Sequence, residues 1–182
     1  MHRRSVAFCR GINVGGHRAT KHQLIAPVAE LGYDEVDTLL ASGNILFRPN
    51  PGAEPDGEAM AAALEAALGF GVPVTIRTAD ELSALAEAEP FAATPTTTEG
   101  AKPQVILLFD RSPAGLTAAA QAAERRSCDD DLLVADPDGG AVHWLPVNGI
   151  SGSGLDQPEL LALFGVHTVR TANTVRRLLQ KA

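Results

Sequence analysis

Phe8-Cys9-Arg10-Gly11-Ile12-Asn13-Val14-Gly15-Gly16-His17 is the stretch that decides the fold, because a short apolar run ends there in a glycine-rich loop. Residues 5–9 have the composition of a buried strand, and residues 20–31 have the apolar spacing of a helix. Glycine adopts positive φ angles without steric cost, so the loop between these segments can turn tightly and approach another group closely. The pattern predicts a strand, a loop and a helix in succession.

The segments that follow this unit alternate in a recognisable order. Strands are expected at residues 36–40 and 44–47, and a helix and a further strand at residues 56–68 and 72–77. The first half therefore has the order β-α-β-β-α-β, and the second half nearly repeats it. This is the order of a ferredoxin-like fold. We predict an α+β protein with two ferredoxin-like (α-β plait) subdomains, each an antiparallel sheet with helices on one face.

A proline- and threonine-rich segment, residues 90–103, is the expected connection between the two halves. A boundary near residue 100 gives an N-terminal ferredoxin-like subdomain over residues 1–99, which includes a linking helix and loop. A C-terminal ferredoxin-like subdomain with a terminal helix then occupies residues 100–182.

The predicted strand order also places two distant segments together. In this fold the first strand lies beside the third, so the loop after the first strand and the hairpin between the second and third strands emerge at one edge. Arg10 and Asn13 are therefore expected to approach the hairpin residues Ser42, Gly43 and Asn44.

Composition narrows the classes of partner and location. The chain of 182 residues has a formal charge of -7, no run of five basic residues and 4% aromatic residues, which disfavours nucleic acid as a partner. No window approaches 18 apolar residues, so no membrane span is expected. Cys9 and Cys128 lack metal-ligand spacing and indicate reduced thiols, which predicts a cytoplasmic protein.

The glycine loop is the main candidate for a binding site. Backbone N–H groups, a following helix N-terminus and the Arg10 guanidinium together are suited to a phosphate or carboxylate group. In this interpretation Asn13 and Asn44 orient the ligand, while Gly15 and Gly16 let the backbone close around it. In the alternative interpretation the loop is only a tight connection, whose polar side chains bond to the neighbouring hairpin.

Other reactive residues define no reaction. Cys9 lies beside a cation but within an apolar strand, where a buried core role is expected. His17 and His22 are spaced five apart and do not share a helix face, so we expect no metal site and no cofactor. The acidic run 129–131 is expected to be a hydrated turn, and Trp144 to pack on the sheet. The sequence leaves open whether the protein is an enzyme.

Three segments together resemble one family of bacterial proteins. They are Arg10-Gly11-Ile12-Asn13-Val14-Gly15-Gly16, Ala41-Ser42-Gly43-Asn44-Ile45-Leu46-Phe47 and the tail at residues 168–178, together with the pair Pro90-Phe91. The chain resembles the DUF1697 family over nearly its whole length. The resemblance implies two ferredoxin-like subdomains in a cytoplasmic protein, and it implies no established activity.

The second half departs from the pattern of that family. A G-I-G-R-S-K-L-like stretch is replaced by Gly149-Ile150-Ser151-Gly152-Ser153-Gly154-Leu155, so both basic positions are glycine. An R-N-W-like triplet is replaced by Arg170-Thr171-Ala172, which keeps the arginine as a candidate ligand contact.

Two hypotheses of different classes follow. The first is a cytoplasmic protein that binds a small molecule or anion through seven candidate residues: Arg10, Asn13, Gly15, Gly16, Ser42, Asn44 and Arg170. The second is a noncatalytic protein–protein interaction module in which the glycine loops are structural. The sequence leaves the oligomeric state open.

Overall fold

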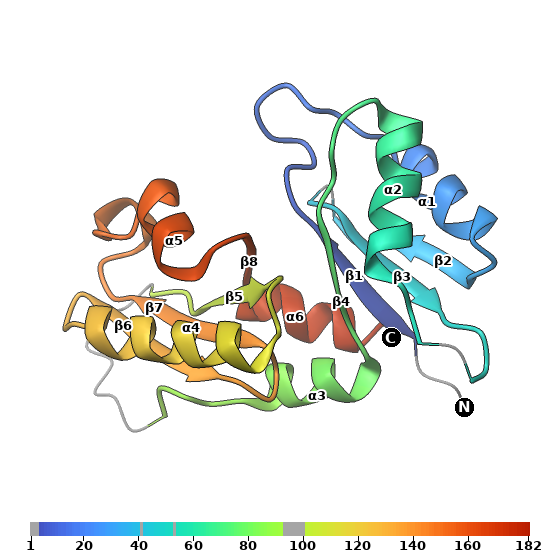
Figure 1. Cartoon of the computed structure of the whole chain (residues 1–182). Coiled ribbons are helices and arrows are strands. Elements are labelled where there is room, and N and C mark those ends of the chain that lie inside the picture. The colour runs from blue at the N-terminus through green and yellow to red at the C-terminus, as the bar shows by residue number, and fades with distance from the viewer. Residues whose placement is uncertain (1–3, 41, 53, 93–100) are drawn as a thin grey trace. The chain divides into compact units, whose positions relative to one another are not determined.

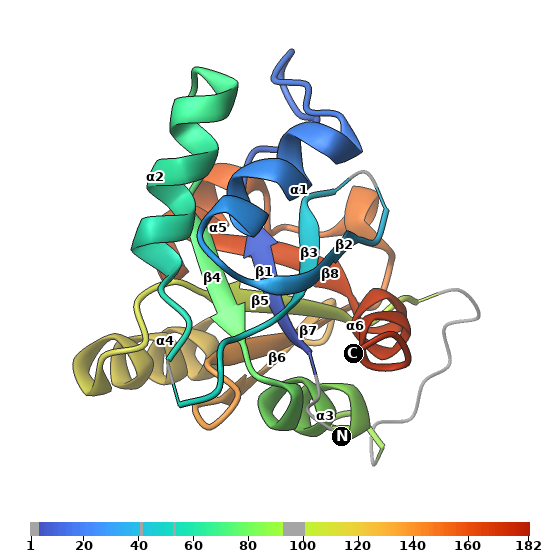
Figure 2. The same cartoon turned by 90° about the vertical axis from the view of Figure 1, so that its right-hand side faces the viewer.

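The computed structural model describes residues 4–40, 42–52, 54–92 and 101–182. By internal contacts the chain divides into two compact units, Met1–Ser83 with Arg177–Ala182, and Ala84–Arg176. Figures 1 and 2 show both units from two directions. The predicted boundary between residues 99 and 100 lies outside the described residues, and so does Ala41 of the predicted hairpin turn.

The first unit contains one antiparallel sheet with the strand order β2-β3-β1-β4. Its elements are β1 (Ser5–Cys9), α1 (Lys21–Glu30), β2 (Asp34–Thr38), β3 (Asn44–Arg48), α2 (Gly57–Leu68) and β4 (Val74–Arg77). Helices α1 and α2 cover the same face of the sheet (Figure 2), where Leu24, Met60 and Leu64 pack with Ala7 and Phe47. This confirms the predicted ferredoxin-like plan.

The second unit repeats the plan with the strand order β6-β7-β5-β8. Its elements are β5 (Gln104–Leu108), α4 (Pro113–Arg126), β6 (Asp131–Asp136), β7 (Ala141–Pro146), a 3-10 helix η1 (Ile150–Gly152), α5 (Gln157–Phe164) and β8 (His167–Thr171). Ala119 and Ala123 of α4 and Leu160 of α5 pack with Ile106 and Val142 of the sheet. The predicted α+β class with two plaits is therefore confirmed.

A helix follows the fourth strand of each plait. Helix α3 (Ala79–Glu87) follows β4, and helix α6 (Ala172–Leu179) follows β8. The chain returns at its end to the first unit, where the Arg4 N–H donates to the Ala182 carbonyl oxygen at 2.9 Å. Arg4 Nη2 also donates to the Lys181 carbonyl oxygen.

Side-chain caps explain where several helices begin. Thr20 and Gln23 form a capping box at the start of α1, and Asp56, Ser112 and Asp156 each accept backbone N–H bonds at the starts of α2, α4 and α5. Such caps satisfy N–H groups that have no partner within the helix.

Strand β2 lies two residues earlier than predicted, at residues 34–38 instead of 36–40. The reason is local, because Leu40 has a positive φ of 63° and the buried Asn44 side chain donates to the Leu39 carbonyl oxygen. The chain therefore turns at Leu39 and Leu40, although their apolar side chains favour a strand.

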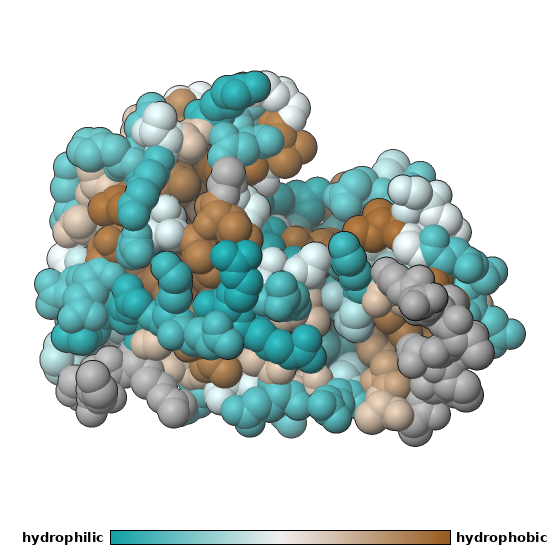
Figure 3. Space-filling view, turned by 180° about the vertical axis from the view of Figure 1, so that it is seen from behind, coloured by the Kyte–Doolittle hydropathy of each residue, from teal (hydrophilic) through white to brown (hydrophobic). Residues whose placement is uncertain are grey.

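Hydrophilic residues cover most of the surface seen in Figure 3, with hydrophobic residues distributed among them. The most exposed large hydrophobic side chains in the described part of the chain are Val14, at 67%, and Ile150, at 58%. None of the described helices is both long and apolar enough to cross a membrane.

Candidate functional site

The glycine loop connects β1 to α1 through several residues in the left-handed region. Gly11, Asn13, Gly15 and Gly16 have φ angles of 80°, 58°, 61° and 91°. Residues 13–18 are exposed, while Ile12 is only 3% exposed and anchors the loop in the core. The loop is thus held at one buried side chain and presents its backbone outward.

Two hydrogen bonds further define this loop. Asn13 Oδ1 accepts from the Ala19 N–H at 3.2 Å, and the His17 N–H donates to the Val14 carbonyl oxygen at 3.1 Å. The His17 ring also lies against Phe70, with 4.3 Å between the ring centroids. Asn13 is therefore part of the scaffold that shapes the loop.

The hairpin between β2 and β3 meets the loop at Gly43. The Cys9 N–H donates to the Gly43 carbonyl oxygen at 2.8 Å, and Phe8 pairs with Asn44 across β1 and β3. A Cβ atom on Gly43 would lie 2.9 Å from both Cys9 Cβ and Ile12 Cγ1. The loop and the hairpin therefore meet at Cys9 and Ile12, the residues on either side of Arg10 and Gly11, while the approach of Arg10 and Asn13 themselves to the hairpin stays a prediction.

Asn44 holds this hairpin together. It is fully buried, and its Nδ2 donates to the Leu39 carbonyl oxygen and to Ser42 Oγ, both at 2.9 Å. Both amide hydrogens of Asn44 are therefore used inside the hairpin. This agrees with the alternative interpretation, in which the polar side chains support the connection and do not contact a ligand.

The segment around the loop is cationic within an acidic protein. No Asp or Glu precedes Glu30, although the whole chain has 22 acidic and 15 basic residues. Arg10, Arg18 and Lys21 belong to this segment. Lys21 pairs with Asp37 of β2 at 2.6 Å, which lowers the pKa of Asp37, chiefly through the hydrogen bond from Lys21.

This ion pair makes a prediction about pH. Because the pKa of Asp37 is lowered in the folded state, its stabilisation is present above the unfolded-state pKa and is lost as the pH falls through the folded-state pKa. Lys21→Met should lower the free energy of unfolding by about 0.2–1 kcal/mol at neutral pH, as is typical of exposed pairs. Near about pH 2.5 the loss should be smaller. Urea unfolding at both pH values measures it, and equal losses would contradict this role of the pair.

Arg170, the remaining predicted contact, belongs to the second unit. Its Nη1 donates to Thr168 Oγ1 at 2.7 Å and to the Val169 carbonyl oxygen at 2.8 Å. Arg77, at the same place on β4, makes the equivalent bonds to Thr75 and Ile76 at 2.8 and 2.9 Å. The two arginines occupy equivalent positions of the repeated fold.

The sequence analysis did not identify this repeat at the residue level. Its signal is present in Thr75-Ile76-Arg77-Thr78-Ala79 and Thr168-Val169-Arg170-Thr171-Ala172, which end β4 and β8 and begin the helices that follow. In each segment the threonine lies two residues before the arginine on the same face of the strand. Its hydroxyl oxygen accepts a hydrogen bond from the guanidinium.

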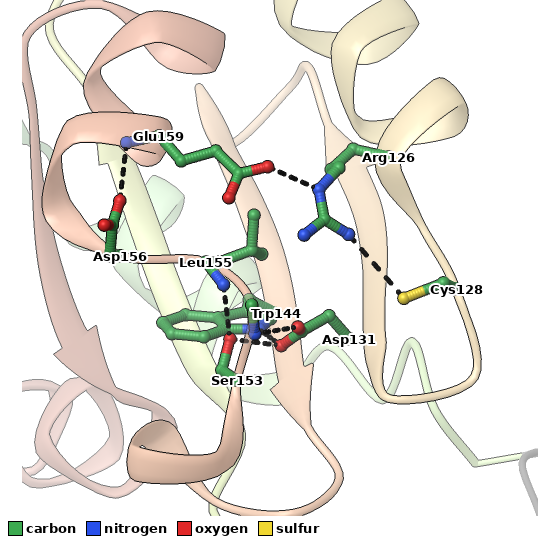
Figure 4. Close-up of polar contacts among 9 residues, drawn as sticks. Arg126, Cys128, Asp131, Trp144, Ser153, Leu155, Asp156 and Glu159 are labelled. Atoms are coloured by element: carbon green, nitrogen blue, oxygen red, sulfur yellow. Dashed lines mark hydrogen bonds and ion pairs between the residues drawn. The ribbon is translucent and has the colours of Figure 1, made fainter.

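The expectation that the acidic run 129–131 is a hydrated turn is wrong for Asp131. This residue begins β6 and is only 1% exposed. Its Oδ1 accepts from Trp144 Nε1 at 2.8 Å and from Ser153 Oγ at 2.6 Å (Figure 4). Its Oδ2 accepts from the Gly154 N–H at 3.0 Å. A buried carboxylate with several donors thus fixes the Gly149–Leu155 loop to the sheet.

Arg126 of α4 lies beside Gly154 of this loop. Gly154 is one of the two positions where the resemblance led us to expect a basic residue. A Cβ atom on Gly154 would lie 3.0 Å from Arg126 Nη2. Arg126 Nε bonds to Glu159 Oε1 at 2.6 Å, which raises the pKa of Arg126, and its Nη1 donates to Cys128 Sγ at 3.7 Å (Figure 4). The glycine at position 154 therefore leaves room for a cation supplied by another element.

Within the described residues, no group of three or more His, Cys, Asp or Glu side chains is arranged to hold a metal ion. Within the described part of the chain, the buried Cys9 and the exposed Cys128 form no disulfide.

Comparison with known proteins supports the fold and the family. The chain resembles the solved structure of a conserved bacterial protein from Streptococcus pneumoniae, with a TM-score of 0.65 and 17% sequence identity. The likeness covers 100% of this chain and 98% of that chain. None of the curated proteins matches the sequence. The family model described as "Protein of unknown function (DUF1697)" matches residues 2–135, which is well over half of the chain. The chain therefore belongs to the DUF1697 family.

Proposed function

We propose that this protein binds a small anionic molecule at the Arg10–Gly16 loop, with the Ser42–Asn44 hairpin as the support that fixes the loop. The observation that carries the proposal is the exposed, left-handed backbone at Gly11, Asn13, Gly15 and Gly16 within a cationic segment. Turns that combine left-handed with right-handed residues direct successive backbone N–H groups toward one point, where they bind anions.

The space around the glycines supports access to this backbone. A Cβ atom built on Gly11, Gly15 or Gly16 would meet no atom within 4 Å. A ligand can therefore approach the main chain there without displacing a neighbouring side chain. Arg10 would neutralise the anionic group and add paired N–H donors.

The hairpin residues have an indirect role in this proposal. Ser42 and Asn44 bond to each other, and Asn44 also bonds to Leu39, so they hold Gly43 against Cys9 and Ile12. Asn13 shapes the loop through Ala19. Arg170 belongs to the other unit and is not assigned to this loop.

We also propose a cytoplasmic location and no nucleic-acid partner. Cys9 and Cys128, which form no disulfide in the described residues, accord with a reducing compartment. The net charge of -7 and the low aromatic content disfavour binding to a phosphate backbone.

A thermal-shift experiment tests the anion site. Inorganic phosphate, glucose 6-phosphate and citrate should be titrated at constant ionic strength into the wild type, Arg10→Ala and Arg10→Lys. A ligand at a hundredfold excess over its Kd stabilises the folded state by about 2.7 kcal/mol, which raises Tm by roughly 5–10 °C in a chain of this length. We expect this rise in the wild type with at least one anion, a smaller rise in Arg10→Lys and none in Arg10→Ala.

The matched control is Arg125→Ala, which removes an exposed arginine from the last turn of α4 in the second unit. It should respond to the anions as the wild type does. Equal Tm increases in Arg10→Ala and the wild type would remove Arg10 from the site. No increase with any of the three anions would reject the proposed site.

A noncatalytic interaction module is the second candidate, and the use of both Asn44 amide hydrogens within the hairpin favours it. In that case the glycines serve only the tight connection, and the exposed Val14 at the loop contacts a partner protein. This candidate predicts no Tm response to the three anions in any variant.

A further inference from the structure

The second unit contains a cavity of about 630 Å³. None of its lining residues belongs to the glycine loop, which is part of the first unit. Strands β5, β7 and β8 form one wall, and η1 with the start of α5 forms the other. Its volume falls within the roughly 300–1,000 Å³ that is usual for sites that bind small molecules. The cavity therefore has the size of a binding site for a small molecule.

Three neighbouring side chains on one face of the sheet form the polar and aromatic part of this wall. Gln104 of β5 pairs with Trp144 of β7 on one side and with Thr171 of β8 on the other. Residues paired in this way across antiparallel strands project from the same face of the sheet. An indole ring, an amide and a hydroxyl group thus lie side by side along the cavity.

Most of the remaining surface of the cavity is apolar, and its lining also includes the polar residues Ser153, Asp156, Gln157, Arg170 and Thr174. Leu155 and Leu160 are 3% and 1% exposed, and Val169 lies beside them on β8. Ile150, at 58% exposed, and Ser151 belong to η1 at the cavity. A mainly apolar surface with polar side chains along it is typical of a pocket that binds an organic ring.

Gln104 is the residue that indicates the chemistry of the ligand. It is 3% exposed, and its Nε2 donates to the Lys102 carbonyl oxygen at 2.7 Å. Its other amide atom, Oε1, has no hydrogen-bond partner within the part of the chain that the structure describes. This oxygen is not fully buried, so it is available at the cavity to accept a hydrogen bond from an N–H or O–H donor of a ligand.

We propose that this cavity binds a heteroaromatic ring of the purine class that carries an exocyclic amino group. The ring lies against Trp144 and the apolar side chains, and its amino group donates a hydrogen bond to Gln104 Oε1. The site is separate from the anion site at the glycine loop and requires no charged group on the ligand.

Trp144 makes the test specific, because it is the single tryptophan of the chain and lines the cavity. Adenosine and purine riboside form a matched pair of probes, since purine riboside lacks only the 6-amino group. Each is titrated into the full chain while the Trp144 fluorescence is recorded, with excitation at the red edge where neither nucleoside absorbs. We expect a saturable change with adenosine and a Kd for purine riboside about tenfold weaker.

Two variants assign the binding to this cavity. Gln104→Met keeps the length of the side chain and removes the acceptor, so adenosine and purine riboside should bind it equally. Ser151→Phe places a bulky ring at the cavity on an exposed residue and should weaken both probes. Far-UV circular dichroism and Tm establish that each variant is folded.

Three outcomes would overturn the proposal. They are no saturable Trp144 response to adenosine, equal affinities of the wild type for the two nucleosides, and binding that neither variant changes. Arg10→Ala should bind adenosine as the wild type does, because the glycine loop takes no part here. Failure of the anion site and failure of this cavity are therefore distinguishable.

Discussion

Asp131→Ala should lower the free energy of unfolding by about 4 kcal/mol. The Asp131 carboxylate is buried and accepts hydrogen bonds from Trp144 Nε1, Ser153 Oγ and the Gly154 N–H. Its removal leaves the buried indole N–H without an acceptor, which costs about 1–3 kcal/mol, and the bonds from Ser153 and Gly154 are lost as well. Urea unfolding followed by Trp144 fluorescence measures the change, because the reporting ring is one of the donors.

Two variants separate the buried network from a general loss of charge. Asp130→Ala removes the adjacent exposed carboxylate, which accepts from Asn148 Nδ2 at 2.8 Å, and should cost less than about 1 kcal/mol. Trp144→Phe removes one donor, leaves Asp131 its other two donors, and should cost an intermediate amount, measured by circular dichroism. Similar losses in Asp130→Ala and Asp131→Ala would show that the network does not stabilise the Gly149–Leu155 loop.

Gly43→Ala should destabilise the protein by about 3 kcal/mol. Two effects add, because residue 43 has a φ of 73° and because its new Cβ would lie 2.9 Å from Cys9 Cβ and Ile12 Cγ1. The first effect strains any residue with a side chain. The second pushes the hairpin away from the start of the glycine loop. The urea midpoint, followed by far-UV circular dichroism, measures the sum.

Gly52→Ala is the matched control for the backbone effect alone. Residue 52 has a φ of 80°, but a Cβ atom there would meet nothing within 4 Å. We expect a loss of about 1 kcal/mol, close to the cost of the left-handed conformation. If the two alanine variants lose the same stability, close packing at Gly43 contributes nothing beyond its φ angle.

The elements of the fold could be predicted because their signals are local. Thr20 caps α1, Gly32 and Gly69 adopt positive φ angles after α1 and α2, and apolar residues recur at helical spacing between them. The order of elements then limited the topology to the plait, which the strand orders confirm. The end of β2 was misplaced because Asn44, five residues away, bonds to Leu39 and closes the turn.

The polar contacts could be predicted only in part, because their partners are distant in sequence. Asp131 is separated by 13 residues from Trp144 and by 22 from Ser153, so composition alone favoured a hydrated turn. The meeting of the glycine loop with Gly43 was predictable, since strand order determines it. The Thr-x-Arg pattern occurs in both halves of the sequence, but only the structure shows that each arginine donates a hydrogen bond to its threonine.

The return of residues 177–182 to the first unit has a consequence for synthesis on the ribosome. The Arg4 N–H donates to the Ala182 carbonyl oxygen, so this contact near the start of β1 forms only after residues 177–182 have been synthesised. During translation the first unit can therefore complete its contacts only after residues 84–176, which lie between its two segments in the sequence, have also been made.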